Sequence, residues 1–205
     1  MELGVWAAFF LMFLAGGLTP GPAVMLVTTS SMRYGFWPAM APATGICIGN
    51  VIWVVLAASG AAVLAHAFPA AFLAVKVIGI AFILYLAWRT AFGEPVDLLR
   101  REPPPRAKLL AHGMGLQLAN PNALVYFGGL MPAYIDAEKD LGLQVAILLV
   151  TVTLTEMFGL VIYALGADAL AKRFQSKMFA HWFFRIAALT MAASASFAVY
   201  ATWGR

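Results

Sequence analysis

The sequence predicts an all-α integral membrane protein with six transmembrane helices, arranged as two inverted three-helix repeats whose first helices are broken. Three observations predict this fold class: the composition, the spacing of apolar segments, and two proline-broken stretches. Of 205 residues, 63% are hydrophobic and only 11% are charged, whereas a soluble domain carries about 25% charged residues. The mean hydropathy is +0.87. This length therefore fits one transmembrane domain, residues 1–205, of roughly six spans joined by short loops.

Six apolar segments meet the length of a spanning helix, which is about 20 residues. They cover residues 3–31, 39–65, 69–92, 111–135, 142–168 and 180–203. The first segment is too long for one straight upright span, which indicates a break or a tilt. Between the third and fourth lies a polar segment with the run Pro103-Pro104-Pro105, a composition typical of a surface loop with a stiff extended patch.

Two proline-broken stretches interrupt the first and fourth apolar segments. They are Thr19-Pro20-Gly21-Pro22 and Asn120-Pro121-Asn122. Proline lacks the amide hydrogen of a helix interior, so these prolines are expected to free three backbone carbonyls, those of Gly16, Leu18 and Gln117. Broken helices are tolerated in a bilayer where they line a cavity or pack against protein. Matched breaks in two halves of a chain point to a transport site; the alternative is a pair of simple kinks.

Basic residues predict the orientation. Ten of the 13 Lys and Arg residues fall in or beside the first, third and fifth loops, two fall on the opposite side, and Lys76 lies within a span. Cytoplasmic loops carry the excess of basic residues, so both termini are expected outside the cytoplasm, in a bacterial inner membrane. Because each half has three spans, the second half enters the membrane inverted. The repeats are expected at about residues 1–92 and 111–205, joined by a cytoplasmic loop at about 93–110.

The same stretches resemble the LysE/RhtB family of amino-acid exporters, and the resemblance covers essentially the whole chain. The motifs that carry it are Pro20-Gly21-Pro22 after a glycine-rich apolar helix, Arg33-Tyr34-Gly35, Gly45-x-x-x-Gly49, Pro69, Lys76-Val77-Ile78-Gly79, Tyr85-Leu86 and Asn120-Pro121-Asn122-Ala123. One departure is Asn122, which stands where many members carry Lys. The resemblance implies efflux of amino acids or similar small metabolites, driven by the proton gradient.

Broken helices supply opposed partial charges for a ligand. After Pro22 or Pro121, the new helix begins with free N–H groups and a positive dipole end, which suits a carboxylate. The freed carbonyls suit an ammonium group. Gly21 has no Cβ and permits close approach of a ligand to the backbone. Together the two ends match an amino-acid zwitterion; the alternative is a kink that only lets helices pack. Gly17-x-x-x-Gly21 and Gly45-x-x-x-Gly49 are small-residue patterns that favour close helix contact, so these glycines are expected mainly to serve packing, with Gly21 as the exception.

Glu156 is the acidic residue deep in a predicted span, about 14 residues into the fifth segment. Ionisable groups at that depth usually face the bundle interior or a water-filled cavity. Glu156 is therefore expected to carry a proton or to bind a substrate ammonium, with a neutral carboxyl bonded to a neighbouring helix as the alternative. Lys76 is either its charge partner or a side chain that reaches the headgroups. Asn50 and Gln117 are polar candidates for the pathway, or else interhelical hydrogen-bond donors.

Other classes of function are excluded or left as alternatives. The chain has no nucleophile–base pairing, phosphate loop or metal-ligand cluster, so we expect neither an enzyme nor a resident metal or cofactor. The single Cys47 excludes a thiol pair, and no nucleic-acid partner is expected. The predicted function is a secondary transporter that exports a small molecule in exchange for protons, with lipid around it and a homodimer as a plausible assembly. The alternatives are a passive channel or facilitator with the same fold, and an assembly subunit.

Overall fold

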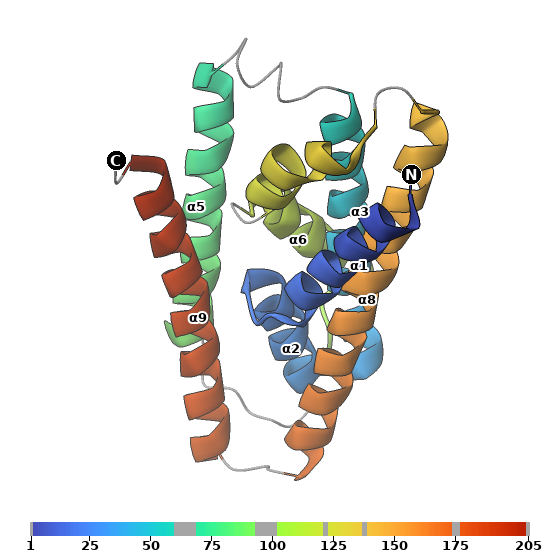
Figure 1. The fold of residues 1–205 in the computed structure, drawn as a ribbon. Helices are drawn as coiled ribbons and strands as arrows, with labels where there is room; N and C mark the ends of the chain where they lie inside the picture. Colours follow the sequence, from blue (N-terminus) through green and yellow to red (C-terminus); the bar gives the residue numbers. More distant parts are fainter. Residues whose placement is uncertain are drawn as a thin grey trace.

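The computed structural model describes residues 2–59, 69–92, 102–120, 123–136, 139–173 and 177–203, and in these ranges every regular element is a helix. Figure 1 shows their arrangement. The elements are α1 (Leu3–Leu18), α2 (Pro22–Tyr34), α3 (Phe36–Ala58), α5 (Pro69–Phe92), α6 (Arg106–Ala119), the π-helix η1 (Leu124–Leu130), the 3₁₀ helix η2 (Met131–Tyr134), α8 (Leu141–Arg173) and α9 (Lys177–Trp203).

Two of these helices, α3 and α8, are each long and apolar enough to cross a membrane, and the bent pair α1–α2 makes a third candidate span if it counts as one. All-helical structure with several candidate spans is therefore confirmed for the described residues. The six-span inverted repeat stays a prediction. Helix α8 is longer than expected: its 33 residues extend about 50 Å, more than the roughly 30 Å hydrocarbon core, so it must tilt or emerge from the bilayer.

The helices form two adjoining groups. Helices α5 and α9 pack against each other along one side of the molecule, while α8 runs along the other side and contacts α1, α2 and α3 (Figure 1). Helix α6 packs chiefly on α3. One apolar core joins α2, α3, α5, α8 and α9, and a second joins α1, α3, α8 and the segment around η1. The start of α2 and the end of α6 are thus buried among the longer helices, whereas the end of α1 at Leu18 is exposed.

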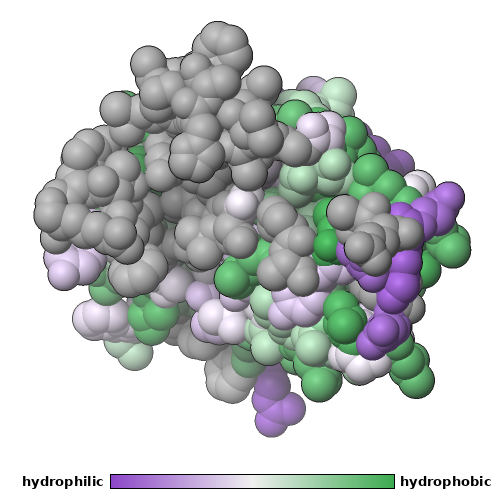
Figure 2. Space-filling model, turned by 45° about the horizontal axis from the view of Figure 1, so that its top comes forward, coloured by the Kyte–Doolittle hydropathy of each residue, from purple (hydrophilic) through white to green (hydrophobic). Residues whose placement is uncertain are grey.

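The outer faces of the long helices are apolar, as a lipid-facing surface requires. Figure 2 shows hydrophobic side chains over much of the described surface, with strongly hydrophilic ones gathered mainly at one edge. On α8 the exposed apolar side chains recur at helical spacing and form a stripe: Leu143, Val150, Leu154, Phe158, Ile162 and Leu165. A soluble helix would present polar residues on this face. The surface therefore supports a multi-pass membrane protein.

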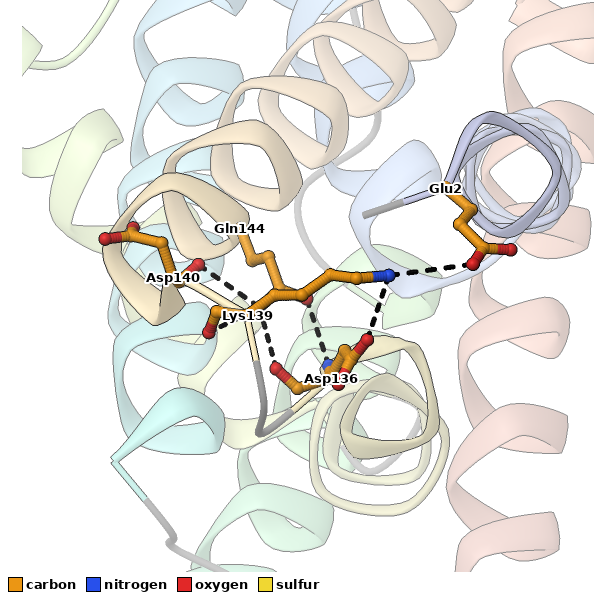
Figure 3. A network of polar contacts seen from close by, with 5 residues as sticks. All are labelled: Glu2, Asp136, Lys139, Asp140 and Gln144. Atoms are coloured by element: carbon orange, nitrogen blue, oxygen red, sulfur yellow. Dashed lines mark hydrogen bonds and ion pairs between the residues drawn. The ribbon is translucent and has the colours of Figure 1, made fainter.

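A polar network holds the start of α8 against the N-terminus (Figure 3). Lys139 Nζ lies 3.0 Å from Asp136 Oδ2 and 3.6 Å from Glu2 Oε1, and the hydrogen bond and charge of Asp136 raise the pKa of Lys139. Gln144 is buried and bridges the turn, since its Oε1 accepts the Asp136 N–H at 3.0 Å and its Nε2 donates to the Asp136 carbonyl at 2.9 Å. Asp140 Oδ1 accepts the Leu143 N–H at 2.6 Å and caps α8.

Glycines set how closely the helices approach. A Cβ on Gly45 would collide with the backbone of Leu110, and one on Gly113 would collide with the carbonyl of Pro42, so α3 and α6 touch backbone to backbone. Likewise a Cβ on Gly159 in α8 would overlap the carbonyl of Gly17 in α1. Small residues at helix crossings permit this contact in membranes. The packing role expected for Gly17, Gly45 and Gly49 agrees with these positions, because Gly49 also faces Gln117 on α6.

Replacing Gly113 with alanine should destabilise the protein by about 1–3 kcal/mol, because the added methyl group must push α3 and α6 apart. Gly166→Ala is the matched control. Gly166 also lies inside a helix, but a Cβ there meets nothing within 4 Å, so alanine should be neutral or stabilising by up to about 1 kcal/mol. Thermal unfolding of both variants in detergent measures the difference; equal midpoints would contradict the close packing.

Candidate transport site

A cavity of about 110 Å³ lies where the α1–α2 break meets the end of α6. A cavity needs roughly 10–15 Å³ to hold a single water, so this one has room for several waters or part of a small solute. Its walls come from α1, α2, α3, α6, η1 and α8. The sequence-predicted residues that line it are Thr19, Pro20, Gly21, Pro22, Asn50, Gln117, Asn120 and Glu156. Residues from both halves of the sequence therefore meet at one place.

The N-terminal end of α2 lies at this cavity. Pro22 occupies the first helical position, where a missing amide hydrogen costs nothing and the fixed φ favours the helix. Gly21 precedes it as N-cap, and no side chain caps this end of the helix. Ala23 and Val24 follow and line the cavity, and their N–H groups fall in the first turn, which has no intrahelical acceptors. The positive end of a helix is thus open to a ligand.

Gly21 differs from the packing glycines. A Cβ at this position would approach only the carbonyl oxygen of Thr19, at 4.0 Å. Its φ of −145° is ordinary extended backbone, which any residue adopts. Neither packing nor conformation therefore requires glycine here, and the open side of Gly21 lies on the cavity.

Three buried amides form a chain across the cavity wall. Gln117 Nε2 donates to Asn50 Oδ1 at 2.5 Å, and Asn120 Nδ2 donates to Gln117 Oε1 at 3.2 Å. Asn50 is only 1% exposed. The Asn50 amide interacts with the neighbouring carboxyl of Glu156, so these two side chains form one polar group in the cavity wall.

Glu156 is the one acidic side chain among the described residues of this wall. The close crossing of α1 and α8 brings it to the break, since a Cβ on Gly17 would lie 3.5 Å from Glu156 Cα. The amide of Asn50 faces its carboxyl. No lysine or arginine of the described residues lines the cavity. A single carboxyl group and the N-terminal end of α2 are thus the two charged features of the site.

The carbonyls freed by proline are not open to a ligand, contrary to the sequence-based expectation. Gly16 O accepts the Thr19 N–H at 3.1 Å, and Leu18 O accepts the hydroxyl of Tyr163 at 2.8 Å. Gln117 O accepts both the indole N–H of Trp53 at 3.1 Å and the Asn120 N–H at 3.2 Å. The physical reason is the cost of a bare carbonyl in an apolar medium. A ligand ammonium is left with Glu156 and the amide oxygens.

The second predicted break is seen only in part. Helix α6 ends at Ala119, and Asn120 follows it in extended conformation. Pro121 and Asn122 lie outside the described residues. The chain then continues as η1 and η2 in place of a regular helix. Short π-helical segments occur frequently at functional sites, and Ala123, Tyr126 and Phe127 on this stretch line the cavity.

Comparisons with known proteins decide the family. The sequence pattern of the LysE type translocator family matches residues 14–202. The chain belongs to the LysE family. Its relatives include a homoserine/homoserine lactone efflux protein of Salmonella typhimurium, 28% identical over 169 residues, 81% of this chain and 82% of that protein. A cysteine/O-acetylserine efflux protein of Salmonella choleraesuis is 26% identical over 82% of this chain and 85% of its own length. No solved structure matches the chain.

A leucine efflux protein of Enterobacter is a further relative of this LysE-family chain, 26% identical over 140 residues, which are 65% of this chain and 63% of that protein. The names of these relatives describe transporters and no enzyme. The family match confirms the resemblance drawn from Pro20-Gly21-Pro22 and the later motifs.

Sequence-based prediction did not identify several residues of the site in this LysE-family protein. Phe13, Tyr126 and Phe127 form an aromatic wall of the cavity, and Trp53 and Tyr163 bind the freed carbonyls. Helical spacing would have pointed to the last two, since Trp53 is three residues after Asn50 and Tyr163 seven after Glu156, each on the same helix face. Lys76 lies in α5, but its side chain is outside the described part, so its pairing with Glu156 stays a prediction.

Replacing Tyr163 with phenylalanine should destabilise the protein by about 0.5–1.5 kcal/mol, because Leu18 O loses the hydroxyl that donates to it. Tyr134→Phe is the control: the Tyr134 hydroxyl lies 3.7 Å from the sulfur of Met12, a weak acceptor, so little change is expected. Chemical or thermal unfolding in detergent compares the two. If Tyr163→Phe proves as harmless as the control, the hydroxyl does not stabilise the break.

Proposed function

We propose that this protein is a secondary transporter that exports amino acids or similar small metabolites from the cytoplasm, in exchange for protons. The observation that carries the proposal is the cavity itself: the open end of α2, the buried amides of Asn50, Gln117 and Asn120, and the carboxyl of Glu156 converge on it. The site would lie near the middle of the bilayer, between the two inverted repeats expected from the sequence.

An amino-acid zwitterion matches the two charged features of the cavity. Its carboxylate suits the N–H groups at the start of α2, where the helix dipole is positive. Its ammonium group suits Glu156, with amide oxygens of the wall as further acceptors. The relatives named for homoserine, leucine, and cysteine or O-acetylserine efflux support a small amino acid or analogue as substrate.

The aromatic wall would face the side chain of the substrate. Phe13 and Phe127 pack with their ring centroids 5.4 Å apart, and Tyr126 lies beside Phe13 with centroids 5.7 Å apart. Such a wall contributes apolar contact area without a polar group that would specify one side chain. It therefore supports neutral substrates of modest size.

Exchange of substrate for a proton would result because one carboxyl group, that of Glu156, binds either the substrate ammonium or a proton. A charged Glu156 binds the substrate ammonium, whereas a protonated Glu156 cannot form that ion pair. When the cavity opens to the outside, proton uptake by Glu156 would release the substrate; when it opens to the cytoplasm, proton loss would restore the site. Each cycle moves one substrate out and one proton in, by alternating access.

Replacing Glu156 with glutamine should reduce proton-driven export to the level of protein-free liposomes, because the neutral amide neither binds an ammonium by charge nor exchanges a proton. The measurement is efflux of radiolabelled leucine and homoserine from proteoliposomes, with and without an imposed pH gradient. Asp168→Asn is the matched control, an acid-to-amide change on the same helix that lies outside the cavity and pairs with Lys172. It should transport like wild type.

Other outcomes of this assay separate the alternatives. Wild-type flux that follows the substrate gradient and ignores the pH gradient would indicate a passive facilitator. Unchanged pH-driven transport by Glu156→Gln would exclude this carboxyl as the proton carrier. Absence of flux for both amino acids would argue against the substrate class.

The orientation is tested by a reporter that is active only in the cytoplasm. Fused after Arg205, it should be inactive, because the distribution of Lys and Arg places the C-terminus outside. The same reporter inserted in the predicted cytoplasmic loop, before α6 begins at Arg106, should be active and serves as the control. Full activity at the C-terminus would reverse the orientation and, with it, the direction assigned to the cavity.

A further inference from the structure

A second cavity lies at the opposite end of α2 and is strongly basic. Its volume is about 80 Å³, and α2, α3, α5 and α6 form its walls together with Pro104. Four of the lining side chains carry or accept positive charge: Arg33, Arg89, Lys108 and His112. They come from three different helices, so the cluster is a product of the fold and not of one basic stretch.

The cationic groups of this basic cavity are held in place and act on one another. The guanidinium Cζ of Arg33 lies 4.6 Å from the ring centroid of Phe184 on α9, a cation–π contact that holds the guanidinium beside the ring. Arg89 and Lys108 lie close enough to His112 for electrostatic interaction. Arg33 and His112 are half-buried, while Arg89 and Lys108 are exposed at the rim. The cavity thus has an inner and an outer ring of positive charge.

Backbone donors add to the positive potential. Helix α6 begins at this cavity, and its N-cap, Pro105, provides no side-chain cap. The N–H groups of Lys108 and Leu109 bond to the Pro105 carbonyl, whereas the residues before them begin the helix and have no intrahelical acceptor. Among the described residues that line the cavity there is no acidic side chain. Like charges gathered in this way repel one another, and a bound anion would relieve the repulsion.

We propose that the basic cavity binds a phosphate group, carried either by an anionic lipid headgroup or by inorganic phosphate. Phosphate presents several oxygens and up to two charges, which matches cations that approach from three helices. Arginine recognises it through paired N–H donors, and lysine adds a point charge. Basic pockets between transmembrane helices on the cytoplasmic side are a common place for acidic lipid headgroups.

Phosphate binding should stabilise the protein, because it joins α2, α5 and α6 in one contact. It is independent of the transport proposal, since the two cavities share the helices α2, α3 and α6 but no lining residue. Arg33 lies about 16 Å along α2 from Pro22, at 1.5 Å per residue. A binding assay therefore tests the basic cavity without any measurement of efflux.

The test is the affinity of purified protein in dodecyl maltoside for three probes: phosphatidylglycerol, phosphatidylcholine and inorganic phosphate. Binding is followed by native mass spectrometry and by the rise in the unfolding midpoint. The variant Arg89→Gln/Lys108→Gln should bind the phosphate-bearing probe at least about tenfold more weakly, because it loses two charge-assisted contacts. The control Arg173→Gln/Arg185→Gln removes the same charge outside the cavity and should bind like wild type.

The outcomes separate the sources of phosphate. Selective loss of phosphatidylglycerol binding identifies a lipid site, and selective loss of inorganic phosphate binding identifies a site for the free anion. The exchange variant Arg89→Lys/Lys108→Arg keeps the charge and should retain most of the binding. That result would show that weaker binding by Arg89→Gln/Lys108→Gln comes from lost charge and not from a folding defect. Equal weakening in the control, binding unchanged in Arg89→Gln/Lys108→Gln, or no binding of any probe by wild type would overturn the proposal.

Discussion

The structure depends on one constraint: a backbone carbonyl in a bilayer must have a hydrogen-bond donor. Proline breaks the helices at the cavity, and each carbonyl that it frees is bound from within the protein, Gly16 O by Thr19, Leu18 O by Tyr163 and Gln117 O by Trp53. Because the protein binds its own acceptors and leaves the first N–H groups of α2 open, the break is asymmetric. It leaves donors for a ligand while the carbonyls of Gly16, Leu18 and Gln117 are already bound. This asymmetry is why the proposed site assigns the anionic group of a ligand to the start of α2.

Close packing of glycine helices places the complementary negative charge. Glu156 stands at the break because α1 and α8 cross at Gly17 and Gly159 without intervening side chains, and the amides reach one another because α3 and α6 touch at Gly45 and Gly113. A larger residue at any of these crossings would move a functional group by the width of a methyl. Gly17 lines the cavity, while Gly45, Gly113 and Gly159 lie outside its wall and act only through packing. The same positions therefore affect both the stability of the fold and the geometry of the site.

The sequence was sufficient for features that depend on local chemistry. Proline and glycine locate the break at residues 19–22, apolar length locates the helices, and a deep carboxyl stands out in an apolar helix, so Glu156 could be named in advance. Contacts between helices were beyond reach. Helices that are apolar on nearly every face carry no amphipathic stripe to set their rotation. Spacing from Asn50 and Glu156 points to Trp53 and Tyr163, but the carbonyls that these two side chains bind could not be assigned, and neither could the aromatic wall at Phe13. The irregular turns of η1 likewise have no signal in spacing.

The single carboxyl is the feature that supports the proposed exchange over passive flow. A pore selects by shape and lets its ligand pass without a change in the wall, whereas the described wall here contains one acid and no lysine or arginine. In the proposed exchange, a proton and an ammonium group would compete for the same carboxyl oxygens. That competition would couple the two movements without a second titrating group, provided that the empty and charged site does not cross the membrane. Burying an unpaired carboxylate is costly. This cost would disfavour movement of the empty, charged site from one side of the membrane to the other.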